Sequence, residues 1–319
     1  TTLFSAPVNA NTVTGVQIDT NNIITGSGGT ITTTTGSSGI VTFNYRNALA
    51  IGAAIDADGD VTVNGSGLTT LSADIVTTSD LVQFYQPVLL VGNRLIDTLK
   101  APAIGAGGSI RFLRTVDGGG NSLTLSAPGA TGNITFDEAA SNLSALTVTS
   151  GKDFLSAAAA PISVGSGGMS VTTSGTTTIN SIVTTSGSGA VTFTNGGLLT
   201  LNANISSDGA VTQNGAGVVR INTDRTITTT ADAVGFATNV TLAKTGGTGL
   251  LTINTTSGNA AGNNITFSSK LDGTTAWAEL LTLNAGTAGN ILFAGAVGAT
   301  GAGSRLGAIN ITQANNVTE

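Results

Sequence analysis

The chain has 319 residues, of which 40% are hydrophobic and only 9% are charged, and it contains 45 glycines and 5 prolines. Abundant apolar residues with little charge exclude an intrinsically disordered chain, and a net charge of −6 provides no basic surface for nucleic acid. The absence of His and Cys removes the commonest general base, the commonest metal ligand and every thiolate site. No apolar run reaches about 18 residues, so we expect neither a membrane-spanning helix nor membrane insertion.

A triplet of an apolar residue, threonine and a second apolar residue recurs along the chain. Alternation with a period of two predicts β-strands, with the apolar side chains on one side and threonine on the other. In chain order the triplets begin at Val41, Val61, Leu123, Ile134, Leu146, Val191, Leu199, Val240, Leu251, Ile265 and Leu281, and variants with another central residue begin at Ile110, Val219 and Ile309.

Short glycine-containing breaks, such as Gly105–Gly108 and Gly118–Gly120, separate the predicted strands. The segments that come closest to helical periodicity are Asp137–Leu143 and Thr275–Leu281. Seven phenylalanines occupy inward triplet positions or their equivalents and are expected to stack in a core. They are Phe43, Phe112, Phe136, Phe193, Phe236, Phe267 and Phe293. The sequence shows no patch of exposed aromatic residues of the kind a carbohydrate platform needs.

Many short strands with glycine turns fit a sandwich, a barrel or a β-solenoid. The solenoid is favoured because the motif recurs without the length variation of Greek-key connections. Low charge is also expected where coils cover one another, and outward Thr, Ser and Asn can form ladders between coils. We therefore predict an all-β parallel β-helix (β-solenoid). The alternative is two tandem β-sandwich domains of about 155 residues each, with antiparallel strand pairing.

A longer period indicates two tandem copies of one unit. Val41 matches Val191 at a separation of 150 residues, and the separation of matching triplets grows to 163 residues toward the end of the chain. The drift indicates short insertions between strands, where solenoids tolerate them. We predict unit 1 over residues 1–156 and unit 2 over residues 157–319, an arrangement also compatible with one continuous solenoid. Neither end shows an obvious polar cap, so we expect a longer array or stacking on neighbours.

Several segments share a recognisable consensus, namely Gln86–Val88, Gly108–Phe112, Val116–Gly118, Leu123–Leu125, Gly132–Phe136 and the later run from Ile265 to Ile311. They resemble repeats of filamentous-haemagglutinin-like giant bacterial surface proteins, which are adhesins. The resemblance implies a right-handed parallel β-helix, secretion across the outer membrane, and an adhesive or architectural role at the cell surface. It carries over no catalytic residues, and the amino-terminal secretion domain of such proteins is not part of this sequence.

Asp56, Asp58 and Asp60 place three carboxylates at alternating positions, and hard oxygen ligands at such spacing could hold Ca²⁺. The bidentate glutamate of an EF-hand-type loop is missing nearby. Two of the three carboxylates are lost at the equivalent positions of unit 2, which favours a glycine-containing turn with solvated aspartates. Calcium at these three residues is the one metal candidate, and no other cofactor is expected.

Arg111, Arg114 and Asp117 cluster as in a pectate-lyase-type β-helix enzyme, but the two arginines have no basic counterparts in unit 2. Solvated surface charges explain them better, so no catalytic residue and no enzymatic activity are expected. The predicted function is a non-enzymatic structural or adhesive repeat protein of the cell surface. It would self-associate with identical or neighbouring repeats into a rod, filament or surface layer. The alternative is a carbohydrate- or receptor-binding adhesin module with a glycan or host-surface ligand.

Overall fold

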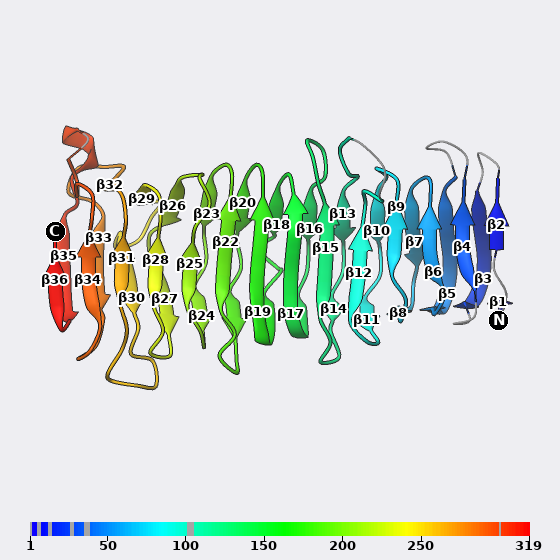
Figure 1. Cartoon of the computed structure of the whole chain (residues 1–319), viewed down its shortest axis with the longest axis horizontal. Helices are drawn as coiled ribbons and strands as arrows, with labels where there is room; N and C mark the ends of the chain where they lie inside the picture. The colour runs from blue at the N-terminus through cyan, green and yellow to red at the C-terminus, as the bar shows by residue number, and fades with distance from the viewer. Residues whose placement is uncertain are drawn as a thin grey trace. The chain divides into compact units, whose positions relative to one another are not determined.

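The computed structural model describes residues 2–4, 8–11, 15–25, 29–34, 39–100, 105–299 and 301–319. It contains two compact units, Thr1–Pro161 and Ile162–Glu319. Each unit is a stack of coils of parallel β-strands, so the predicted β-solenoid is confirmed (Figure 1). The one helical element in these ranges is the 3₁₀ turn η1 (Ala302–Ser304), and none there is long and apolar enough to cross a membrane.

Three parallel strand ladders form the sides of unit 1, and β3, β5 and β17 each turn a corner and belong to two of them. The first ladder contains β3 (Val16–Thr25), β5 (Val41–Ile51), β7 (Val61–Gly65), β10 (Val82–Phe84), β13 (Ile110–Phe112), β16 (Ile134–Phe136) and β18 (Phe154–Ser156). The second contains β1 (Thr2–Phe4), β3, β5, β8 (Leu68–Leu71), β11 (Val88–Leu90), β14 (Val116–Asp117) and β17 (Ala140–Gly151). The third contains β2 (Val8–Ala10), β4 (Thr30–Thr33), β6 (Ala54–Ala57), β9 (Ile75–Thr77), β12 (Arg94–Asp97), β15 (Leu123–Ala127) and β17.

Unit 2 is built in the same way, and its strand β19 belongs to two ladders. Its first ladder contains β19 (Ile162–Thr173), β22 (Val191–Asn195), β25 (Val211–Gln213), β28 (Val234–Phe236), β31 (Ile265–Phe267), β34 (Asn290–Phe293) and β36 (Asn316–Thr318). The second contains β20 (Thr177–Ile179), β23 (Leu199–Leu201), β26 (Val219–Asn222), β29 (Val240–Ala243) and β32 (Leu271–Gly273). The third contains β19, β21 (Val183–Thr185), β24 (Ile205–Ser207), β27 (Arg225–Thr229), β30 (Leu250–Asn254), β33 (Leu280–Asn284) and β35 (Ala308–Gln313).

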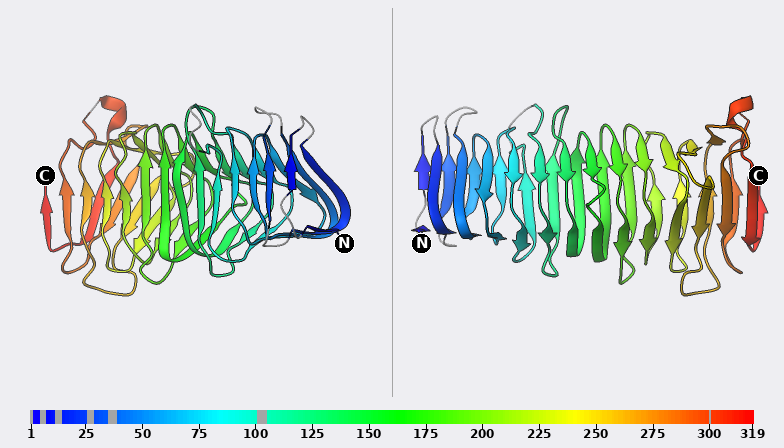
Figure 2. Two further views of the ribbon diagram at one scale, coloured as in Figure 1. Left: turned by 45° about the vertical axis from the view of Figure 1, so that its right-hand side comes forward. Right: turned by 180° about the vertical axis from the view of Figure 1, so that it is seen from behind.

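The direction of strand pairing decides between the two predicted architectures. All of these ladders are parallel, whereas the consecutive strands of a β-sandwich pair antiparallel, so the tandem-sandwich alternative is wrong. Two further views show the strands of each unit running side by side, with the connections at the corners between ladders (Figure 2). The two segments nearest to helical periodicity are not helical either, because β17 and β33 begin inside them and pair with the adjacent coil.

The core of each coil follows directly from the triplet pattern. The apolar residues of a triplet, such as Val41 and Phe43, are fully buried, and the central Thr42 lies on the outer face. Because the ladders are in register, identical side chains of successive coils lie above one another. In unit 1 the rings of Phe84, Phe112 and Phe136 stack nearly parallel, with centroids 5.1 and 5.0 Å apart. The burial of the predicted phenylalanine core is therefore confirmed, although Phe43 lies in register between Ile18 and Val63 instead of between two rings.

Unit 2 repeats this stack at the positions that match in sequence. Phe236, Phe267 and Phe293 lie on β28, β31 and β34, with ring centroids 5.6 and 5.5 Å apart. By the same sequence matches, β5 corresponds to β22 and β23 together, and the strands from β6 to β16 correspond in order to those from β24 to β34. Along the chain, the boundary between the two compact units falls between Pro161 and Ile162, and the division into tandem copies after residue 156 stays a prediction.

Candidate functional site

The three aspartates of the predicted calcium site lie in and after β6, and their contacts differ. Asp56 forms an ion pair with Lys100 on the outer face of unit 1. Asp60 accepts a hydrogen bond of 2.9 Å from the backbone N–H of Leu81. Among the residues that the structure describes, no group of three or more His, Cys, Asp or Glu side chains is placed to hold a metal ion. Calcium at Asp56, Asp58 and Asp60 stays a prediction.

Asp80, which the sequence did not single out, lies beside Asp58 and Asp60. Its Oδ2 atom is shielded from solvent and has no hydrogen-bond partner among the described residues. Burial, followed by the negative charges of Asp60 and Asp58, raises the pKa of Asp80 to about 6. The structure therefore concentrates negative charge between the turn after β6 and the segment before β10.

The raised pKa of Asp80 predicts a pH-dependent stability. The folded state binds the Asp80 proton more tightly than the unfolded chain, whose aspartates titrate near 3.8. The resulting stabilisation is fully present below about pH 4 and is lost as the pH rises through about 6. Asp80→Asn should therefore match the wild type near pH 4 and exceed it at about pH 7 by on the order of 1 kcal/mol, after discounting for solvent screening.

Urea unfolding of both proteins at the two pH values measures this difference. Asp56→Asn is the matched control, because Asp56 pairs with Lys100 instead of facing Asp80, and it should not gain stability at neutral pH. A constant difference between Asp80→Asn and the wild type across this range would contradict the prediction.

The charged residues weighed as a catalytic set make contacts between coils. Arg111 Nε lies 2.8 Å from Asp137 Oδ2, and Arg114 Nη1 lies 2.7 Å from Glu138 Oε1. Asp117 Oδ1 accepts hydrogen bonds from a backbone and a side-chain amide nearby. The sequence predicted that these arginines are solvated surface charges. It did not predict their acidic partners, which lie one coil further along the chain. The expected absence of enzymatic activity stays a prediction.

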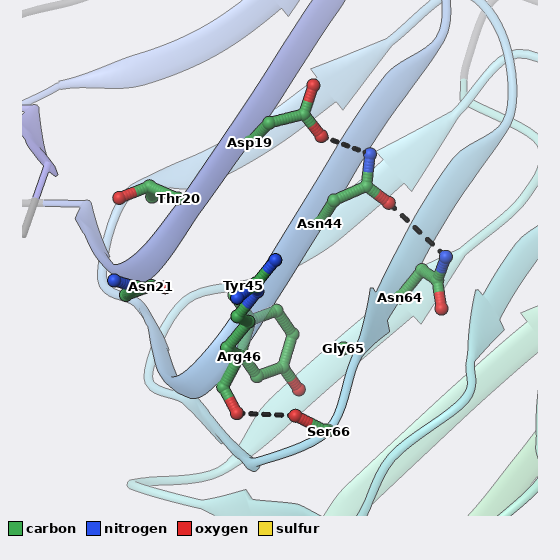
Figure 3. Close-up of a pocket in the computed structure, with 9 residues that line it drawn as sticks. All are labelled: Asp19, Thr20, Asn21, Asn44, Tyr45, Arg46, Asn64, Gly65 and Ser66. Carbon is green, nitrogen blue, oxygen red and sulfur yellow. Dashed lines mark hydrogen bonds between the residues drawn. The ribbon is translucent and has the colours of Figure 1, made fainter.

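A polar groove of about 640 Å³ opens on unit 1, where β3, β5 and β7 lie side by side (Figure 3). We call it the amide groove. Its lining residues are Asp19, Thr20, Asn21, Asn44, Tyr45, Arg46, Asn64, Gly65 and Ser66. Three successive coils contribute to it, so the sequence could not assemble it without the register of the coils.

A row of hydrogen-bonded side chains crosses the amide groove. Asn64 Nδ2 donates to Asn44 Oδ1 at 3.3 Å, and Asn44 Nδ2 donates in turn to Asp19 Oδ1 (Figure 3). Tyr45 points inward and its hydroxyl shares a hydrogen bond of 2.6 Å with Thr69 Oγ1. Burial raises the pKa of the Tyr45 hydroxyl, against a smaller lowering by that hydrogen bond. The outer wall of the groove is thus polar and its floor is packed.

Unit 2 provides an internal comparison for the amide groove. The positions of Arg46 and Ser66 are taken by Gly196 and Ala216, so the cation and the hydroxyl are absent from the equivalent place. Amide rows as such occur in both units, since Asn202 Nδ2 donates to Asn180 Oδ1 at 2.6 Å. Rows of amides therefore occur in both units, and the row of unit 2 also has an arginine beside it, because Arg225 Nε donates to the Asn202 carbonyl.

The outer faces offer hydrogen-bonding side chains at the roughly 4.8 Å spacing of neighbouring strands. Such an array can form hydrogen bonds with an extended polar ligand or with a further β-coil. Comparison of the chain with protein-family models, with curated proteins and with solved structures finds no match.

Proposed function

We propose that this chain is part of a non-enzymatic, structural or adhesive repeat protein of the bacterial cell surface. Its coils would stack end to end into a rod, filament or surface layer outside the cell, through contacts with identical or neighbouring repeats. The proposal agrees with the neutral, Thr-, Ser- and Asn-rich outer faces of both solenoid units and with the absence of cysteine. The resemblance to filamentous-haemagglutinin-like repeats supports the same location and role.

The observation that carries this proposal is the in-register parallel stacking of the coils, which β35 and β36 continue in unit 2. Ile309 and Val317 continue the inward rows of Leu281 and Ile291, which are buried, yet they are 39% and 46% exposed. An edge strand also presents unpaired N–H and C=O groups in the direction of the next coil. A further coil of the same kind would bury these side chains and pair these groups in the register used throughout the unit.

The test is end-to-end association of the purified chain. The double variant Ile309→Lys/Val317→Lys places charges on the uncovered row and should abolish concentration-dependent association, because stacking would bury both ammonium groups. Asn310→Lys, on the outward side of the same strand, is the matched control and should associate like the wild type. Sedimentation and negative-stain electron microscopy measure the outcome. A wild-type chain that stays monomeric at high concentration, or equal association of the double variant, would contradict it.

A second candidate is a carbohydrate- or receptor-binding adhesin module. The amide groove of unit 1 supports it, because a row of amides beside the exposed Arg46 can pair with the hydroxyls of an extended ligand. Screening the whole chain against glycans separates this candidate from a purely structural role.

A further inference from the structure

Two of the insertions in unit 2 lie in the connections after β32 and after β34. Asp117 and Asp272 are 155 residues apart, whereas Leu123 and Leu281 are 158 apart, so the connection between β32 and β33 has three additional residues. The connection between β34 and β35 is also longer, because the separation of matching residues grows from 157 at Ile134 to 163 by Leu146. Insertions in solenoids lie in loops and frequently form binding surfaces.

The two insertions lie together in space. The backbone N–H of Trp277 donates to the Arg305 carbonyl at 2.9 Å, and that of Gly307 donates to the Glu279 carbonyl at 2.7 Å. The Arg305 guanidinium lies over the indole of Trp277, 5.5 Å from the ring centroid. A groove of about 210 Å³ adjoins the pair, lined by Trp277, Val297, Gly298, Arg305, Leu306, Ala308 and Ile309. We call this arrangement the tryptophan platform.

Trp277 has an unusual backbone conformation for a residue with a large side chain, and its indole is not part of the core. The side chain is 64% exposed, and its φ of 66° lies in the left-handed region that favours glycine. In unit 1 the equivalent connection uses Gly119 and Gly120, with φ of 56° and 82°. A non-glycine residue there costs on the order of 1–3 kcal/mol, and such strain gathers at functional positions. The shorter connection of unit 1 places glycine in this region, so a tryptophan at position 277 carries a backbone strain that glycine would avoid.

A buried carboxylate holds the first insertion in place. Glu279 is fully buried, and its Oε1 accepts hydrogen bonds from Thr274 Oγ1 at 2.8 Å, from Lys244 N at 3.1 Å and from Thr275 N at 3.2 Å. Charge-assisted bonds to several backbone amides fix the loop before any ligand arrives. The platform is therefore preorganised, which reduces the entropy lost on binding.

We propose that the tryptophan platform binds a glycan through the face of a pyranose ring. The electron-rich face of the indole attracts the C–H groups of a sugar ring, and the guanidinium presents a planar fork of donors to neighbouring hydroxyl or carboxylate oxygens. Within the described part of the chain Arg305 forms no ion pair, so its donors are available. This inference does not depend on the proposed end-to-end stacking, although Ile309 belongs both to this groove and to the row that stacking would cover.

The surroundings favour a glycan over a protein partner. Ile309 is the other large apolar residue with substantial exposure at this groove. A stable protein interface buries roughly 800 Å² on each partner around an apolar centre, and one indole beside a small groove does not supply that area. A single aromatic plane with a few donors matches a ligand of one or two sugar rings.

The experiment uses the whole chain on a glycan array, followed by titration with soluble oligosaccharides of neutral hexoses and of uronic acids. The chain has a single tryptophan, so its fluorescence reports directly on the platform. We expect a blue shift on binding. Trp277→Gly should weaken binding by about tenfold or more, with stability unchanged or raised because glycine relieves the strain. Trp277→Tyr should retain most of the affinity, and Tyr85→Ala, an exposed aromatic of unit 1, is the control.

If the chain binds uronic acids, and if added salt and Arg305→Gln both weaken that binding, then Arg305 contacts a sugar carboxylate. If the chain binds neutral hexoses with an affinity that does not depend on salt, then Arg305 contacts sugar hydroxyls. Both results support the site. Absence of binding to any glycan, equal affinity of Trp277→Gly, or capture of a protein that sugars do not displace would overturn it. None of these outcomes affects the association test at β35 and β36.

Discussion

Phe112→Ala should lower the free energy of unfolding by about 3–5 kcal/mol. The Phe112 ring is fully buried and lies between the rings of Phe84 and Phe136, at 5.1 and 5.0 Å. Its removal takes away the transfer free energy of the side chain, two aromatic contacts and the volume that keeps three coils in register. A parallel ladder fixes the backbone on both sides, so the cavity cannot collapse. Guanidinium unfolding followed by circular dichroism measures the loss.

Two further variants make the Phe112 result specific. Phe267→Ala removes the equivalent ring of unit 2, stacked at 5.6 and 5.5 Å, and should cause a loss of similar size. Val91→Ala, at a half-exposed side chain outside the core, should change stability by less than about 0.5 kcal/mol. If Phe112→Ala behaves like Val91→Ala, the phenylalanine stack does not stabilise the solenoid as proposed.

Glu279→Ala should lower the free energy of unfolding by on the order of 3 kcal/mol. The buried carboxylate accepts hydrogen bonds from the backbone N–H groups of Lys244, Thr274 and Thr275 and from the Thr274 hydroxyl. Alanine leaves these donors without an acceptor in a site that excludes water. Glu279→Gln keeps one acceptor oxygen and should lose less. Thermal and chemical unfolding of the purified variants give the two values.

Glu138→Ala is the matched control for Glu279. Glu138 pairs with Arg114 at 2.7 Å on the outer surface, where an ion pair contributes up to about 1 kcal/mol. Equal effects of Glu138→Ala and Glu279→Ala would show that the buried carboxylate does not hold the loop. The fluorescence of Trp277 provides an independent signal, because loss of the Glu279 contacts should shift its emission even in folded protein.

The strand content and the identity of the core were predictable because both depend on local alternation. In Val191-Thr192-Phe193 the period of two determines which side chains face inward. A stack of such strands buries these side chains for any conformation of the connecting loops. The matching phenylalanines of the two copies were predictable for the same reason. Residues 137–143 and 275–281, the segments nearest to helical periodicity, are not helical because hydrogen-bonding partners on the adjacent coil outweigh a short helical pattern.

The candidate sites were much less predictable, because their partners come from other coils. Gln213 occupies an inward position that an apolar side chain would normally fill, and Val63 fills its counterpart in unit 1. It is accommodated by hydrogen bonds with Asn195 Oδ1 at 2.9 Å and with Thr238 Oγ1 at 3.2 Å, from the coils on either side. The sequence contains these residues but not the register that brings them together.

The sequence by itself determined that this protein is an all-β repeat with an apolar interior and a neutral exterior, because side-chain alternation and glycine turns act over a few residues. It favoured a solenoid over tandem sandwiches, and the parallel strand pairing of the structure decided between them. Only the tertiary structure decided which residues meet across coils: Asp80 with Asp58 and Asp60, Arg111 with Asp137, and Trp277 with Arg305. The lengths of the loops between the strands determine which of these side chains come into contact. The insertion of three residues between β32 and β33 leaves the strand pattern unchanged, yet it places the indole of Trp277 in solvent beside the guanidinium of Arg305.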